Sequence, residues 1–399
     1  MIPLSVPCLD GNEWRYLKEC LDTNWVSSVG PFVDKFEQLI AQRLGAKHAV
    51  ATSTGTAALH TALLVADVKP NDAVLVPALT FVATANAVRY VGADPVFIDV
   101  DPTYWQMDPQ LVTEFLERQC RVNNGQLHDR ATGQRIKAVI PVHLLGHPVD
   151  IDPIIEISHS YGLHVIEDAA ESIGAQYRSQ AVGHLGDIAC FSFNGNKIIT
   201  SGSGGMIVTD NSSWAERARY LTTQAKNDAS EYVHDEIGFN YRMTNVHAAL
   251  GCAQLEQLDS HVSRKRAIAR RYLKAFEQLE GIEPMRQAPW ALCTYWLFTI
   301  LVAADEFGMD SRQLRQRLAS LGIESRPLWR PLHLNRPYDK GLRFPVSERL
   351  HQCALSLPSS PALSREEQAH VIEAVWGALQ RQSNSRAQRW HPAHSRLQD

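Results

Sequence analysis

The segment His164-Val165-Ile166-Glu167-Asp168-Ala169-Ala170-Glu171 contains the pattern that decides the fold. A short apolar run of β-forming residues ends in two adjacent carboxylates, Glu167 and Asp168. Open α/β sheets bind their ligands at the carboxyl ends of such strands. A carboxylate at this position either caps the following helix or is a buried acid that pairs with a cationic group, such as a protonated pyridine nitrogen. These residues alone leave both interpretations open.

Short apolar runs alternate with helical stretches on both sides of this segment. The alternation predicts an α/β fold with a mainly parallel central sheet sandwiched by helices. The predicted strands are Ala73–Val76, Pro95–Asp99, Ile136–Val142, His164–Glu167, Ile188–Phe193 and Met206–Thr209. The predicted helices between them are Thr56–Ala66, Ala83–Val91, Asp108–Gln119, Ile151–Tyr161 and Trp214–Thr223.

The domain organisation follows from a long helical stretch, Asn245–Leu279, whose apolar residues recur at helical spacing. We predict a large domain over residues 1–250 and a linking helix with a small C-terminal α/β domain over 251–380. The N-terminal segment is expected to pack on the small domain. Residues 381–399 are basic and polar with few apolar partners, which predicts a disordered tail, with a basic contact arm as the alternative.

Composition excludes several classes of protein. The 399 residues are 45% hydrophobic, so the chain can bury a large core. A formal net charge of −4 gives no electrostatic signature of nucleic-acid or membrane binding, and no apolar stretch is long enough to span a bilayer. Seven scattered cysteines without a C-x-x-C pair predict a reduced, cytoplasmic location and no zinc site or other metal site.

The stretch Ser53-Thr54-Gly55-Thr56 opens a predicted helix with small and hydroxyl residues. The free N–H groups and the positive end of such a helix form an anion site, although an ordinary N-cap is the alternative. The chain has no G-x-x-x-x-G-K-[ST] motif and no G-x-G-x-x-G after a strand. P-loop and dinucleotide-binding interpretations are therefore weak.

A third motif places Lys197 after the predicted strand Ile188–Phe193 and before the small-residue stretch Ser201–Gly205. A lysine on a loop that a flat ligand can approach is able to form a Schiff base. The order of anion site, strand-end acid and lysine is the one expected for pyridoxal phosphate. That cofactor needs a phosphate cradle, an acid at its ring nitrogen and a Schiff-base lysine.

These three motifs, and about residues 2–380 around them, resemble the DegT/StrS-type nucleotide-sugar aminotransferases, a branch of the fold-type I pyridoxal phosphate enzymes. The segments Phe193–Thr200, Gly238–Arg242 and Arg326–Trp329 look most like the branch that aminates C4 of UDP-4-keto-6-deoxy-N-acetylglucosamine for bacillosamine and legionaminic acid. The resemblance implies amino transfer from L-glutamate to a nucleotide-linked keto sugar. The alternatives are a GDP- or dTDP-linked keto sugar aminated at C3 or C4, or a regulatory protein that binds the cofactor without turnover.

The resemblance also implies the residues that perform the chemistry. Lys197 would form the Schiff base and move protons, and Asp168 would keep the cofactor ring nitrogen protonated. Glu171 would lie near the cofactor hydroxyl. Phe81 would stack on the ring, with a place in the core as its alternative. His143 is interpreted as a structural, hydrogen-bonded histidine.

Binding groups are implied in the same way, including some from a second copy of the chain. Asn240 would reach the phosphate held by the neighbouring subunit, and Arg242 would meet the glutamate carboxylate. The expected assembly is therefore a homodimer with shared active sites. Trp329 and His333 would border the sugar-nucleotide site. The phosphate ligands within one chain would be Gly55, Thr56 and Ser192.

Overall fold

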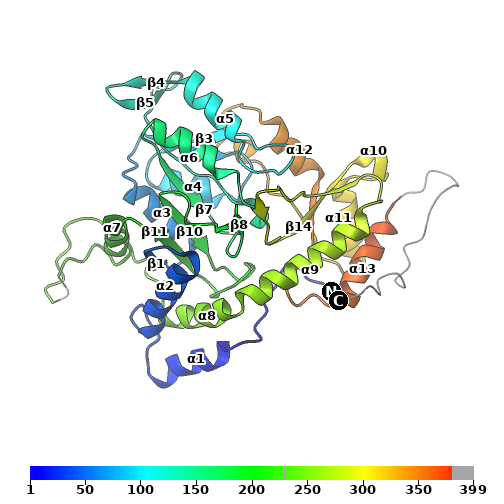
Figure 1. Ribbon diagram of the computed structural model, residues 1–399, viewed down its shortest axis with the longest axis horizontal. Helices are drawn as coiled ribbons and strands as arrows, with labels where there is room; N and C mark the ends of the chain where they lie inside the picture. The colour runs from blue at the N-terminus through cyan, green and yellow to red at the C-terminus, as the bar shows by residue number, and fades with distance from the viewer. Residues whose placement is uncertain (229, 380–399) are drawn as a thin grey trace.

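The computed structural model describes residues 1–228 and 230–379, and these residues are built around a seven-stranded sheet (Figure 1). Strand β11 is antiparallel to both its neighbours, and the pairs from β10 across to β3 are parallel. The predicted α/β fold with a mainly parallel sheet is confirmed. In spatial order the strands are β1 (His48–Thr52), β11 (Gly205–Thr209), β10 (Ile188–Ser192), β7 (His164–Asp168), β6 (Ile136–Val139), β2 (Ala73–Pro77) and β3 (Asp94–Ile98).

Helices cover both faces of this sheet because successive strand residues point to opposite sides. In β7, Ile166 packs into the cluster with α3, α4 and α7, whereas Val165 packs into the cluster with α2, α5, α6 and α8. The helices of the first face are α3 (Gly55–Val65), α4 (Ala83–Tyr90) and α7 (Ser212–Thr222). Those of the second face are α2 (Pro31–Leu44), α5 (Pro109–Glu114), α6 (Ile151–Ser160) and α8 (Asn245–Glu256).

The long helical stretch that the sequence predicts is divided into two helices. Helix α8 ends at Glu256, and α9 (Leu258–Phe276) starts after a break at Gln257. Figure 1 shows α9 running from α8, beside the central sheet, to the second part of the molecule. The predicted domain boundary at residues 250 and 251 falls inside α8, so a continuous backbone helix crosses it.

The second part is a four-stranded antiparallel sheet with helices around it. The N-terminal segment packs here, because Ile2 pairs with Ile323 and the N–H of Leu4 donates a hydrogen bond to Glu324. In spatial order the strands are β12 (Ile282–Pro284), β14 (Phe298–Val302), β16 (Ala354–Leu357) and β15 (Arg326–Pro327). The helices are α10 (Ala304–Phe307), α11 (Ser311–Ser320), α12 (Pro345–Cys353) and α13 (Arg365–Trp376). The short helix η3 (Leu332–Leu334) instead packs on the first part, where the N–H of Leu332 donates to the carbonyl of Ala78.

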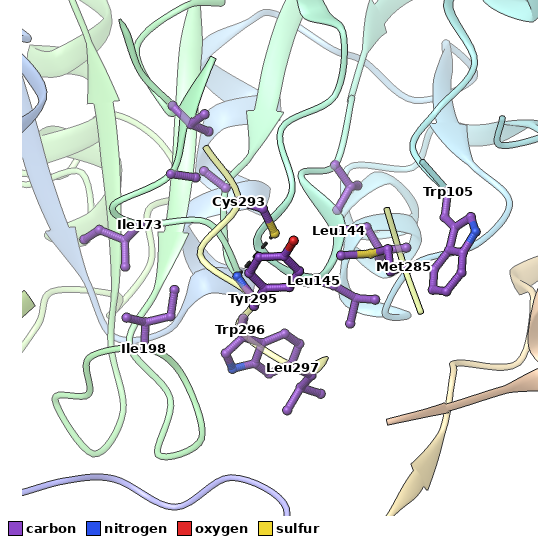
Figure 2. Close-up of a cluster of buried hydrophobic side chains, with 14 of the residues drawn as sticks. Trp105, Leu144, Leu145, Ile173, Ile198, Met285, Cys293, Tyr295, Trp296 and Leu297 are labelled. Carbon is purple, nitrogen blue, oxygen red and sulfur yellow. Dashed lines mark hydrogen bonds between the residues drawn. The ribbon is translucent and has the colours of Figure 1, made fainter. Parts of the chain in front are cut away.

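The two parts share a continuous core. Figure 2 shows Leu144 and Leu145, which follow β6, packed with Tyr295, Trp296 and Leu297 just before β14. Within residues 1–228 and 230–379, no helix combines the length and the apolar character that crossing a membrane requires. The tail 381–399, for which we predict disorder, lies outside the described residues.

The remaining elements lie outside the two sheets and the helices given above. They are α1 (Glu13–Asp22), η1 (Phe115–Gln119), η2 (Leu144–Gly146), the hairpin β4 (Cys120–Asn123) and β5 (Gln126–Asp129), and the small sheet of β8 (Gln176–Tyr177), β9 (Gln180–Ala181) and β13 (Ala291–Leu292).

Candidate active site

A cavity of about 400 Å³ opens where β7 and β10 end and α3 begins. The second part of the molecule supplies the rest of its lining, including Trp296, Arg326 and Trp329. The predicted site residues that line it are Gly55, Thr56, Phe81, Asp168, Glu171, Ser192, Lys197 and Trp329. Phe81 is 53% exposed, so it stands at the cavity and not in the core.

Asp168 is the last residue of β7 and is buried in the floor of the cavity. The hydroxyl of Thr84 donates a 2.7 Å hydrogen bond to Oδ2, and the N–H of Ala170 donates one of 3.2 Å to Oδ1. Burial raises the pKa of Asp168, and the donors and the charge of Lys197 offset only part of this effect. A buried carboxylate with few donors is stabilised by a cation, so a protonated ring nitrogen fits here.

The start of α3 fits a phosphate group. The side chain of Thr54 caps the helix by accepting a hydrogen bond from the N–H of Ala57. The N–H groups of Gly55 and Thr56 belong to the first turn, where a helix has no internal partner for them. A Cβ on Gly55 would lie 2.7 Å from Cβ of Ser192, so only glycine allows the helix to approach β10 this closely. The free N–H groups and the positive end of α3 therefore lie next to the hydroxyl of Ser192, and together they can bind an anion such as a phosphate group.

Lys197 enters the cavity from the loop after β10. The loop is shaped by a turn in which the N–H of Lys197 donates to the carbonyl of Asn194. The Nζ atom of Lys197 lies 3.7 Å from Oε1 of Glu171 and 4.0 Å from the centroid of the Trp296 ring. An amine between a carboxylate and an aromatic face is held at the cavity surface and is shielded from bulk water.

Glu171 is the second buried carboxyl group of the cavity. The N–H of Leu145 donates a 2.8 Å hydrogen bond to its Oε2. Burial raises the pKa of Glu171 to about 7, and the charge of Lys197 acts in the opposite direction. The group therefore exchanges a proton near neutral pH, which suits proton transfer with the adjacent amine.

His143 lies beneath this floor, where the sequence places a structural histidine. The N–H of Val149 donates to its Nδ1 at 3.2 Å, so Nε2 carries the ring proton and donates to Glu167 at 2.9 Å. Three backbone N–H groups also reach the Glu167 carboxylate. They belong to Gly183, Leu185 and Gly186.

Three predicted binding residues lie outside the cavity of their own chain. Asn240 is exposed and its backbone pairs with Thr223, whereas the Arg242 guanidinium forms an ion pair with Glu37. His333 is 1% exposed, bonds to Glu348 at 3.1 Å and packs on Phe344. The prediction that His333 borders the sugar-nucleotide site differs from this closed, hydrogen-bonded position.

Several residues line the cavity or support it without a clear signal in the sequence. Thr84 lies in the first turn of α4, one turn after the predicted ring-stacking residue Phe81, and this spacing is the signal that could have found it. Ser203 donates from its hydroxyl to the carbonyl of Ser53, which ties the small-residue loop to the start of α3. Trp296 and Arg326 come from the second part of the molecule. Arg326 belongs to the segment 326–329 that carries the family resemblance, but no role is predicted for it, and no local pattern points to Trp296.

Together these groups match the needs of one cofactor: an acid for a ring nitrogen, an amine for an aldehyde and a cradle for a phosphate. They define the class of pyridoxal-phosphate-dependent enzymes with the type I fold. The model of the DegT/DnrJ/EryC1/StrS aminotransferase family matches residues 7–376. The chain belongs to this family, and it is a pyridoxal-phosphate-dependent aminotransferase.

Individual relatives are similar along nearly their whole length. EpsN of Bacillus subtilis (strain 168), whose name describes a pyridoxal phosphate-dependent aminotransferase, is 41% identical, with 94% of this chain and 95% of the relative covered. GDP-perosamine synthase of Escherichia coli O157:H7 is 40% identical, covering 94% and 97%. The crystal structure of DesV from S. venezuelae superimposes with a TM-score of 0.83 at 32% identity, covering 93% of this chain and 95% of that one.

Proposed function

We propose that the protein transfers the amino group of L-glutamate to a nucleotide-linked 4-keto-6-deoxy sugar. The observation that carries this proposal is the lining of one cavity, to which Lys197 and Asp168 contribute together with Arg326 and Trp329. A guanidinium suits a diphosphate, and an aromatic ring suits a sugar or base face. Relatives that are named GDP-perosamine synthase support a nucleotide sugar as the class of substrate.

The residues of the chain divide the work of such a transfer. Pyridoxal phosphate, when bound, supplies an electron sink for the charge that develops at the carbon bearing nitrogen. Asp168 keeps the proton on the ring nitrogen through a charge-assisted hydrogen bond. The Lys197 amine gives and takes the proton at the reacting carbon, and Glu171, 3.7 Å away, exchanges protons with that amine. The start of α3 binds the phosphate.

For the acceptor we propose UDP-4-keto-6-deoxy-N-acetylglucosamine, which would yield UDP-4-amino-4,6-dideoxy-N-acetylglucosamine for a surface glycan or a nonulosonic acid. The resemblance of segments 193–200, 238–242 and 326–329 to enzymes of that specificity supports it. A GDP-linked 4-keto-6-deoxy sugar is the second candidate. It is favoured by two relatives, 40% and 39% identical, that are named GDP-perosamine synthase.

A substrate panel tests the proposal directly. The purified enzyme, supplied with L-glutamate, is incubated with UDP-, GDP- and dTDP-linked 4-keto-6-deoxy sugars, and the products are identified by mass spectrometry. We expect one nucleotide series to be aminated at C4 and 2-oxoglutarate to accumulate in equal amount. Cofactor binding without amination of any sugar would contradict the proposal and favour a regulatory protein.

The assignment of Lys197 has its own test. Borohydride reduction of the enzyme with its cofactor should attach the cofactor to Lys197, as read by peptide mass spectrometry. The Lys197→Ala variant should bind the cofactor without a covalent bond and lose turnover. Attachment at the buried Lys265 or at any other lysine would overturn the assignment.

We further propose a homodimer with shared active sites. Asn240 is exposed and Arg242 is held by Glu37, both just before α8 and outside the cavity of their own chain. Mixing Lys197→Ala subunits with Asn240→Ala/Arg242→Ala subunits should restore about a quarter of the activity, because random exchange makes half the dimers mixed and each has one intact site. Absent activity after demonstrated exchange of two folded variants would reject sharing.

A further inference from the structure

The amine of Lys197 has an aromatic neighbour that belongs to a distant part of the chain. The Trp296 side chain comes from the segment before β14, and its ring centroid lies 4.0 Å from Nζ. The residue is 3% exposed, so the indole is part of the protein interior as well as of the cavity wall. An ammonium group above an indole face is attracted by the electron density of the ring.

Trp296 is fixed by hydrogen bonds at three separate atoms. Its backbone N–H donates to the carbonyl of Leu145 at 3.0 Å, and its indole Nε1–H donates to the carbonyl of Asn196 at 2.7 Å. Its own carbonyl accepts a 2.9 Å hydrogen bond from Nζ of Lys265. Because Asn196 directly precedes Lys197, the ring cannot turn without breaking a bond to the loop that delivers the amine.

The backbone of Leu145 contacts both neighbours of the Lys197 amine, Trp296 and Glu171. Its carbonyl accepts from Trp296, and its N–H donates to Glu171, so one peptide segment orients both neighbours of Nζ. Its φ of +58° is in the left-handed region, which costs a leucine about 1 kcal/mol or more. Figure 2 shows Leu145 and Trp296 within the same buried cluster, next to Tyr295.

Lys265 anchors the tryptophan from behind. It is 1% exposed, and its Nζ donates to the carbonyls of Trp296 and Ser359, the second at 2.7 Å. Burial lowers the pKa of Lys265 to about 7. The amine thus links α9 to the segment before β14 and to the segment after β16, and Lys265 is not among the residues that line the cavity.

We propose that Trp296 is a positioning residue that holds the Lys197 amine beside Glu171, and that Lys265 positions Trp296. The inference rests on the role of Lys197 in the proposed function. It adds that the geometry of the reacting amine depends on the second part of the molecule. The link is the hydrogen bond from Trp296 to the carbonyl of Asn196, which joins residues about 100 positions apart in the sequence.

Nuclear magnetic resonance of the cofactor-free protein tests the contact without any turnover. In lysine-labelled protein, the ε-methylene protons of Lys197 should be shifted upfield by the ring current of Trp296, with the signal assigned through Lys197→Arg. Trp296→Leu should abolish the shift, and Trp296→Phe should reduce it. Trp376→Phe is the matched control, because it loses a similar indole bond, to Ala275 at 3.0 Å, far from the cavity.

Kinetics of the enzyme with cofactor then test the consequence. We expect Trp296→Leu to lower kcat about 10- to 100-fold with little change in KM for glutamate, because misplaced reacting groups lose rate. Trp296→Phe should have a kcat between those of Trp296→Leu and the wild type. Lys265→Met should lower kcat relative to the wild type, but less than Trp296→Leu does.

Two results would overturn the inference. One is an unshifted Lys197 signal in the wild-type protein. The other is an unchanged kcat in a folded Trp296→Leu or Trp296→Phe variant. Borohydride attachment at a different lysine would instead overturn the proposed function, and the resonance shift would stay readable.

Discussion

Glu167 and Asp168 are adjacent at the end of β7, and both are buried. Their surroundings nevertheless shift the pKa values of the two carboxyl groups in opposite directions. Glu167 accepts hydrogen bonds from His143 and three backbone N–H groups. Burial disfavours its charge, but these donors outweigh burial and lower the pKa of Glu167. Asp168 accepts from only Thr84 and Ala170 among the described residues, and burial raises its pKa.

The comparison separates a structural acid from one that is available to a ligand. The donors around Glu167 satisfy its charge inside the protein, so this carboxylate holds His143 and the segment between β9 and β10 in place. Asp168 keeps unused acceptor capacity and lines the cavity, so it is able to accept a hydrogen bond from a cationic group of a ligand. The number of hydrogen-bond donors, more than the depth of burial, distinguishes the two carboxylates. A substitution of Asp168 should therefore lower activity, whereas a substitution of Glu167 should lower stability.

The largest expected effect is loss of activity in Asp168→Asn. The amide is almost isosteric but cannot stabilise a protonated ring nitrogen by a charge-assisted hydrogen bond. We expect kcat to fall by about 10³-fold, comparable to the loss of a strong electrostatic contact in an active site. The thermal unfolding midpoint should stay close to that of the wild type. A wild-type rate would mean that Asp168 only caps the following turn.

Glu167→Gln should show the reverse pattern. Its amide N–H₂ would face backbone N–H donors, and the buried network would lose its charge. We expect about 3 kcal/mol of lost stability, within the range for a disrupted buried charge network. Calorimetry should show a lower Tm, while kcat per folded enzyme stays close to wild type. A variant of normal Tm and reduced kcat would show that Glu167 acts on the chemistry through His143.

Glu171 provides a smaller effect that depends on pH. Its pKa of about 7 lies above the ordinary value of 4.5, so the folded protein binds this proton more tightly than the unfolded chain. The resulting stability is fully present below pH 4.5 and is lost as pH rises to about 7. In cofactor-free protein we expect a loss of about 2 kcal/mol across this window relative to Glu171→Gln. Parallel stability curves for the two proteins would contradict the shift.

The sequence predicts β7 and its two carboxylates because an apolar run followed by acids is a local signal. It does not predict β1 or β16, whose partner strands lie far along the chain, such as β11 for β1. Strand periodicity requires Glu167 and Asp168 to point to opposite faces. Which face holds the cavity depends on tertiary packing, so the residues alone could not choose between them.

In the candidate site, too, some residues have a local sequence signal, whereas others depend on contacts between distant parts of the chain. Thr56 and Lys197 follow from motifs next to predicted elements, Ser192 is implied by the family resemblance, and the structure brings all three to one cavity. Trp296 was missed because its role depends on a contact made across about 100 residues of chain. The contact of His333 with Glu348 could not be predicted, because Glu348 belongs to α12, a helix with no clear local signal, and the role of His333 at the sugar-nucleotide site stays a prediction.

Thr84→Val should produce the smallest effect, because it changes a single hydrogen-bond donor to Asp168. It removes one of the two donors to Asp168 and keeps the shape of the side chain, so the carboxylate loses about 1 kcal/mol of stabilisation. We expect kcat to fall about fivefold, with its acid limb moved to higher pH because the pKa of Asp168 rises further. Thr61→Val is the matched control, because its hydroxyl is also buried but donates to the carbonyl of Ala57. Equal pH profiles for the two variants would show that the donors around Asp168 do not control its charge.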